Sequence, residues 1–172
     1  MNPTRGDRIL KVDHAGEHGA VNIYRAQILI SRLTAPELTA TLRHFLAHEQ
    51  RHRALFWSRM RSRSVRRCRS YALCGVGSYA LGLVTALLGR QAIAATTYAV
   101  ESVVLRHLEG QLVALKDSDT DAYGTVLDIV EEEREHHDHG QRLLETGRFW
   151  PVLITPIVRW STEAVIWVGM RL

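Results

Sequence analysis

The sequence predicts an all-α fold, a four-helix bundle with two additional apolar or amphipathic helices. Apolar residues recur at alternating steps of three and four along most of the chain, which is typical of helices that bury one face. Only 4 prolines, 7% aromatic residues and few alternating β-branched runs argue against a β-sandwich or barrel. With 46% hydrophobic and 23% charged residues in 172, we expect one globular domain spanning residues 1–172.

The periodicity and the polar breaks place the helices in order along the chain. The first is expected at about 8–32, and Thr34–Glu37 then offers an N-cap with proline in the first turn. A polar break at 116–120 separates two later helices. The remaining helices are expected at about 38–56, 71–88, 94–115, 122–143 and 151–170.

Charged residues occupy positions on these inward faces where leucine is expected. They are Glu17, Glu49, His52, Glu101, Glu133 and His136. Burying one carboxylate is unfavourable, and four that face one another without a cation are worse. A bound metal ion resolves the conflict because it supplies the missing positive charge.

The six residues repeat at a fixed interval. Adding 84 to positions 17, 49 and 52 gives 101, 133 and 136, which predicts two duplicated halves, about 8–62 and 92–146, with a metal centre on their pseudo-two-fold axis. One glutamate from each of two helices and Glu-x-x-His from each of two others is the ferritin-like dinuclear arrangement. These ligands suit iron or manganese. The alternative is that these carboxylates are surface or salt-bridged groups.

The other histidines are expected to be a mixture of groups near the metal centre, surface groups and solvated groups. They are His14, His18, His44, His48, His107, His137 and His139. A metal-bound imidazole usually donates its second N–H to a carboxylate, which Glu132 or Asp138 could supply. The interpretation that we favour is that both carboxylates simply face solvent.

An arginine cluster precedes an uncharged apolar segment at 71–89. The cluster comprises Arg59, Arg61, Arg63, Arg66, Arg67 and Arg69. The aromatic residues that single-strand nucleic-acid binders interleave are missing, so we expect no nucleic-acid partner. Arginines beside an apolar helix favour an anionic membrane surface, with the segment lying in the interface. The alternatives are a solvated loop for the cluster and a buried core helix for the segment.

The two cysteines, Cys68 and Cys74, are too few for a disulfide framework or a cysteine-rich metal site. The sequence lacks the charged region, the apolar region and the small-residue cleavage site that follow one another in a signal peptide. We therefore expect a reducing compartment and free thiols.

Several motifs resemble those of the demethoxyubiquinone hydroxylase family of ubiquinone biosynthesis. In chain order, these motifs are Val12–Ala20, His48–His52, Thr85–Gly89, Ala99–Glu101 and Glu132–Asp138. The similarity spans about residues 9–172. Two positions depart from the family pattern: Ser102 replaces a second acidic residue, and Leu108 replaces a tyrosine after the retained His107.

The resemblance implies a di-iron monooxygenase that hydroxylates the ring of a polyprenylated demethoxybenzoquinol with O₂. It implies two iron ions per chain, held by the six residues named above, with no catalytic residue predicted beyond these ligands. It also implies a peripheral position on the cytoplasmic face of a bacterial inner membrane, or on the matrix side of the mitochondrial inner membrane in a eukaryote. Other ubiquinone-biosynthesis proteins are possible partners.

Two other functions share some of these features. A rubrerythrin-type peroxidase or iron-handling protein would use the same ligand geometry. However, rubrerythrin-type proteins often carry a cysteine-rich module, and storage proteins need polar exteriors. A non-catalytic membrane lipid-binding partner would keep the fold without turnover, but the presence of all six ligands weighs against it.

Overall fold

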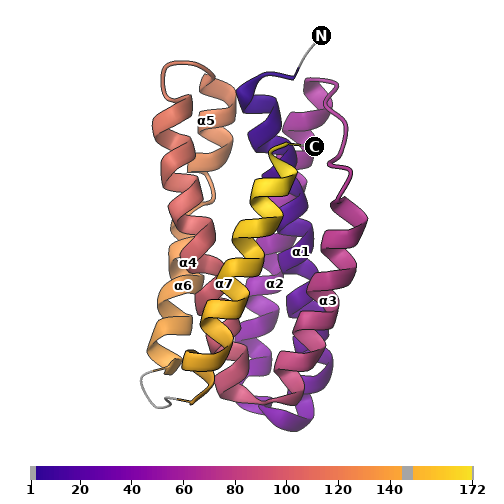
Figure 1. Ribbon diagram of the computed structural model, residues 1–172, viewed down its shortest axis with the longest axis vertical. Coiled ribbons are helices and arrows are strands. Elements are labelled where there is room, and N and C mark those ends of the chain that lie inside the picture. The colour runs from indigo at the N-terminus through magenta and orange to yellow at the C-terminus, as the bar shows by residue number, and fades with distance from the viewer. Residues whose placement is uncertain (1–2, 145–148, 172) are drawn as a thin grey trace.

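The computed structural model describes residues 3–144 and 149–171, and within them the chain is helical throughout, without strands (Figure 1). The α-helices are α1 (Arg5–Thr34), α2 (Thr39–Ser62), α3 (Tyr71–Leu87), α4 (Arg90–Leu115), α5 (Thr120–Leu127), α6 (Val130–Leu144) and α7 (Phe149–Gly169), with a short 3₁₀ helix η1 (Pro36–Leu38) before α2. The all-α prediction is confirmed. The last two residues of the predicted half 92–146 lie outside the described residues.

Four long helices form the bundle, and two others cover it. α1 packs against α2, and α4 packs against α6, so the helices of each predicted half are neighbours. α3 lies along α1, and α7 lies along α4 across the front of the bundle in Figure 1. The helix packing is compatible with a single domain and with an internal duplication. It tests neither of them, so both stay predictions.

The prediction of one continuous helix over 122–143 is wrong. α5 ends at Leu127, Asp128 and Ile129 form a turn, and α6 begins at Val130. The new helix has Glu131, Glu132 and Glu133 in its first turn. Acidic side chains are favourable there because the N-terminal end of a helix carries a partial positive charge. The apolar spacing alone did not reveal this break.

Small residues bring the two covering helices close to the bundle. A Cβ atom on Gly82 of α3 would lie 2.5 Å from the carbonyl oxygen of Ile23 in α1, so only glycine fits at that crossing. On α7, Ile154 and Val158 pack against alanines of α4, which are Ala92, Ala95 and Ala99. Both α3 and α7 are therefore half-buried, and α3 is not the buried core helix of the alternative interpretation.

The bundle core has an apolar layer at each end and a polar layer between them. One apolar cluster contains Leu10, Phe56 and Leu108, and the other contains Tyr24 and Ile93. Along each of α1, α2, α4 and α6, the predicted metal-ligating positions lie between residues of the two clusters. The helices therefore hold the polar layer at the centre of the molecule, away from the ends.

Part of the arginine cluster stabilises one end of the bundle. Arg63 forms two hydrogen bonds of 2.5 and 2.6 Å with Asp119 and an ion pair with Asp7. The Arg67 guanidinium lies 4.4 Å from the centre of the Trp57 ring. These side chains hold the chain after α2 against α1 and the start of α5. The arginine cluster is therefore not a simple solvated loop, and some of its arginines are not free to bind lipid.

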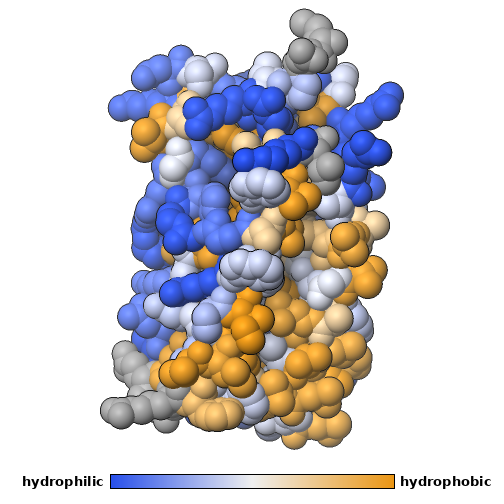
Figure 2. Space-filling model, viewed as in Figure 1, coloured by the Kyte–Doolittle hydropathy of each residue, from blue (hydrophilic) through white to orange (hydrophobic). Residues whose placement is uncertain are grey.

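The exposed apolar residues gather on α3 and α7. Figure 2 shows this surface as an orange area over α3 and the first half of α7, while the opposite end of the molecule is hydrophilic. Its exposed residues include Leu73, Val76, Val152, Ile157 and Trp160. Within the described residues, α7 alone has the length and composition that would allow a helix to cross a membrane.

Candidate metal centre

The six residues predicted from the sequence meet in the central polar layer. Glu17 comes from α1, Glu49 and His52 from α2, Glu101 from α4, and Glu133 and His136 from α6. All six are buried, with at most 6% of any of them exposed. The helical period explains the convergence, because an i, i+3 pair projects from one helix face.

The ligands form two overlapping groups, each compact enough to hold one ion. One group is Glu17, Glu49, His52 and Glu133, and the other is Glu49, Glu101, Glu133 and His136, with ligand atoms in each group within 4.8 Å of one another. Glu49 and Glu133 belong to both groups. The sequence alone indicated six ligands, and the structure adds which two carboxylates could bridge a pair of ions.

Both histidines direct Nδ1 into this cluster. The Nδ1 atom of His52 lies 2.8 Å from Glu133 Oε1, and Nδ1 of His136 lies 3.1 Å from Glu49 Oε1. These four inward-facing atoms have no hydrogen-bond partner within the described residues. Unpaired buried nitrogen and oxygen atoms that face one another are what a metal ion satisfies, so the residues fit a dinuclear site.

The charges of the carboxylates also call for a cation. Burial, followed by the charges of Glu133 and Glu49, raises the pKa of Glu101 well above its usual range. Burial alone lowers the pKa of His52, but Glu133 and Glu17 outweigh it and raise this pKa to about 11. Without metal, the cluster therefore holds protons in places where the ions would bind.

The outward nitrogens of the two imidazoles have different partners. Nε2 of His52 lies 2.9 Å from Glu132 Oε2, and Glu132 also pairs with Arg51. Nε2 of His136 lies 3.1 Å from Nδ1 of His48. The interpretation that both carboxylates face solvent is therefore wrong for Glu132, which faces the imidazole of His52, whereas the half-exposed Asp138 pairs with the less exposed His137.

The remaining histidines fall into several environments. His14 is buried and stacks with Trp57 and Tyr71, so it is a core residue. His18 also stacks on Tyr71, and His107 pairs with Glu163 at 2.8 Å. Tyr24, which the sequence analysis did not single out, donates a hydrogen bond from its hydroxyl to Glu101 Oε1 at 3.2 Å.

A cavity of about 550 Å³ connects the cluster with the apolar surface. Its inner end is lined by the four glutamates of the cluster, and its walls are formed by apolar residues of α1, α3, α4 and α7. Leu73 of α3 and Val165 of α7 line it and are also exposed on the surface. Leu108, at one of the two departures from the family pattern, contributes an apolar wall.

Comparisons with known proteins identify the family of this chain. The family described as "Ubiquinone biosynthesis protein COQ7" matches residues 4–169. The chain belongs to this family. The match covers nearly the whole chain, so all four bundle helices and both covering helices lie within the COQ7 region.

Curated COQ7 relatives carry hydroxylase names. The 3-demethoxyubiquinol 3-hydroxylase of Rhodospirillum rubrum is 36% identical over 96% of this chain and 77% of its own length. The NADPH-dependent 3-demethoxyubiquinone 3-hydroxylase of Homo sapiens is 36% identical over 78% of this chain and 63% of its own. The 5-demethoxyubiquinone hydroxylase of Saccharomyces cerevisiae is 38% identical over 62% and 46%. The chain thus spans about three quarters of the bacterial relative and less than two thirds of the human one.

The raised pKa of Glu101 predicts how the metal-free protein responds to pH. A carboxyl group whose pKa is higher in the folded protein than in the unfolded chain binds more protons in the folded state. The stability of the protein then falls as the pH rises from the pKa in the unfolded chain towards the pKa in the folded protein. Glu101→Gln replaces the protonated carboxyl with a neutral amide, so folding no longer requires the uptake of a proton at this position. We expect this variant to raise the free energy of unfolding of the metal-free protein at pH 7 by about 1–3 kcal/mol. The free energy of unfolding should also decline less between pH 5 and pH 7 in the variant than in the wild type.

Urea unfolding at several pH values measures this effect. Glu109→Gln is the matched control, because Glu109 lies on the same helix but is exposed. If Glu101→Gln destabilised the metal-free protein at pH 7 more than Glu109→Gln, the charge argument would be contradicted.

Proposed function

We propose that this protein is a di-iron monooxygenase that hydroxylates the ring of a polyprenylated demethoxyubiquinol with O₂. The observation that carries the proposal is the cavity, whose inner end is lined by the carboxylate groups and whose outer end opens on an apolar surface. A quinol ring with a long isoprenoid tail has the same polarity, with a polar head and an apolar chain. The hydroxylase names of the COQ7 relatives support this substrate class.

The six buried residues have distinct parts in this proposal. His52 and Glu17 would hold one iron, His136 and Glu101 the other, and Glu49 and Glu133 would bridge them, as the two overlapping groups suggest. When bound, the two irons supply the activation of O₂. Tyr24 holds Glu101 in place through its hydroxyl, and Glu132 orients the ring of His52.

The remaining cavity residues would bind and orient the quinol. Apolar side chains of α3 and α7 would surround the tail and exclude water from the ring. Burial raises the pKa of Asp13 to about 7, and Gln111 donates a hydrogen bond to one of its oxygens. Asp13 lines the same cavity and can accept or return a proton near neutral pH.

The exposed apolar area also supports a peripheral position on a membrane. α3 and α7 both present large apolar side chains beside the cavity mouth, so a lipid surface there would deliver the substrate directly into the cavity. The mitochondrial names of several relatives agree with an inner-membrane pathway. In a bacterium we place the protein on the cytoplasmic face. Other ubiquinone-biosynthesis proteins would meet it on that membrane.

Iron content tests the ligand assignment. Protein reconstituted anaerobically with ferrous iron should hold about two irons per chain, and Glu49→Ala or Glu133→Ala should lower that number, because each carboxylate serves both positions. Full iron loading of the double variant Glu49→Ala/Glu133→Ala, measured by elemental analysis, would disprove the assignment.

The quinone content of cells tests the reaction. A deletion strain that expresses His136→Ala should accumulate the demethoxy quinone and lack ubiquinone, because one iron position loses its only imidazole. The neighbouring His137→Ala should restore ubiquinone, since the His137 imidazole pairs with Asp138 and contacts the Tyr98 ring. Normal ubiquinone with stably produced His136→Ala would overturn the hydroxylase proposal.

Vesicle binding tests the membrane surface. Val76→Glu on α3 and Trp160→Glu on α7 should each weaken binding to anionic vesicles about tenfold, which corresponds to roughly 1.4 kcal/mol. Val113→Glu on α4 is the control, since Val113 is 83% exposed but lies outside α3 and α7. Equal flotation of all three variants and the wild type would exclude this surface.

A further inference from the structure

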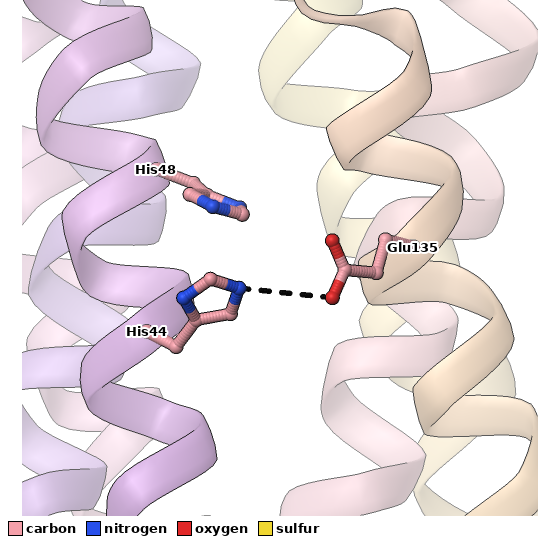
Figure 3. A group of neighbouring side chains, drawn as sticks. All are labelled: His44, His48 and Glu135. Carbon is pink, nitrogen blue, oxygen red and sulfur yellow. Dashed lines mark ion pairs between the residues drawn. The ribbon is translucent and has the colours of Figure 1, made fainter.

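A second group of metal-ligating side chains lies on the outer side of α2 and α6. His44 and His48 project from α2 towards Glu135 of α6 (Figure 3). One ligand atom from each of the three lies within 4.8 Å of the others, and the rings of the two histidines are 4.2 Å apart. The group lies outside the dinuclear cluster but touches it through His48.

The three side chains have the chemistry of a transition-metal site. Two imidazoles one helical turn apart and a facing carboxylate are ligands that divalent iron accepts. Nε2 of His44 lies 3.7 Å from Glu135 Oε1, which is too long for a hydrogen bond. Ligand atoms on one ion are roughly 3 Å apart, so a small rotamer change suffices. His44 and Glu135 are about half exposed, so an ion and water can reach them.

The pseudo-two-fold relation supplies an independent argument for a cation here. The shift of 84 that relates the inner ligands also relates His48 to Glu132 and Arg51 to Glu135. At the related place, the Arg51 guanidinium pairs with Glu132. Among the described residues, the only ion pair of Glu135 is with His44. Glu132 therefore has the Arg51 guanidinium as a cation beside it, whereas Glu135 has beside it two imidazoles that can bind a metal cation.

We propose that His44, His48 and Glu135 form a surface site for divalent iron, from which the ion passes to the inner position beside His136. His48 joins the two places. Its Nδ1 faces Nε2 of His136 at 3.1 Å, which leaves the Nε2 atom of His48 for the surface ion.

The hydrogen bond between the two rings allows the ion to move without a net change in the number of bound protons. Only one proton fits between His48 Nδ1 and His136 Nε2. When the surface ion occupies His48 Nε2, that proton belongs to His48 and the second proton is on His136 Nδ1. When the ion occupies His136 Nδ1, the shared proton belongs to His136 and His48 Nε2 regains one. Each ring keeps one N–H throughout, and the iron stays ferrous.

The test is the rate at which the metal-free full-length protein takes up limiting ferrous iron under anaerobic conditions. A ferrous chelator added at successive times removes unprotected iron, and the protected iron is counted. His44→Ala and Glu135→Gln should slow the loading of one iron about tenfold, within the range for lost partners of metal ligands. The final iron content should equal that of the wild type.

Two control variants match these changes. His137→Ala removes another imidazole near the site, and Glu131→Gln removes another exposed acidic charge from α6, so both should load at the wild-type rate. Equal loading rates in all variants would overturn the proposal. A lower final iron content in His44→Ala would overturn it as well, because His44 would then retain iron rather than deliver it. Neither O₂ nor quinol is present, so the outcome is independent of the hydroxylase proposal.

Discussion

The burial of four carboxylates and two imidazoles in one layer is the constraint on which the rest of the structure depends. Such a layer is unfavourable in an apolar core unless a cation compensates its charge. The apolar clusters on either side hold the helices in register, so that the six groups face one another. Because unpaired nitrogen and oxygen atoms remain at the centre, bound ions would complete this layer.

Much of this centre could be predicted from the sequence, because helical spacing fixes which side chains share a face. Glu49 with His52 and Glu133 with His136 are one helical turn apart, and charged residues at leucine positions are conspicuous. The roles of Glu49 and Glu133 as members of both groups required the structure, since spacing does not tell how four helices cross.

Other features depended on interactions that have no periodic signal. The break after α5 is followed by a new helix, whose start is favoured by the acidic residues in its first turn. The spacing of apolar residues gives no signal of this start. The partner of His136 is an imidazole, His48, and not a carboxylate, and this facing residue comes from another helix. Arg63 looked like part of a lipid-binding cluster, but its ion pairs with Asp7 and Asp119 become apparent only when α1, α2 and α5 are assembled.

The sharing of Glu49 and Glu133 between the two groups has an evolutionary consequence. Neither half of the chain completes a group by itself, because each takes a glutamate from the other half. Two identical copies of one helical pair, related by a two-fold axis, would present the same six ligands. The predicted duplication is consistent with an ancestral homodimer that held both ions before the two copies were joined. In such a history, fusion would let positions away from the axis diverge, and Arg51 and Glu135 are related positions that differ in this way.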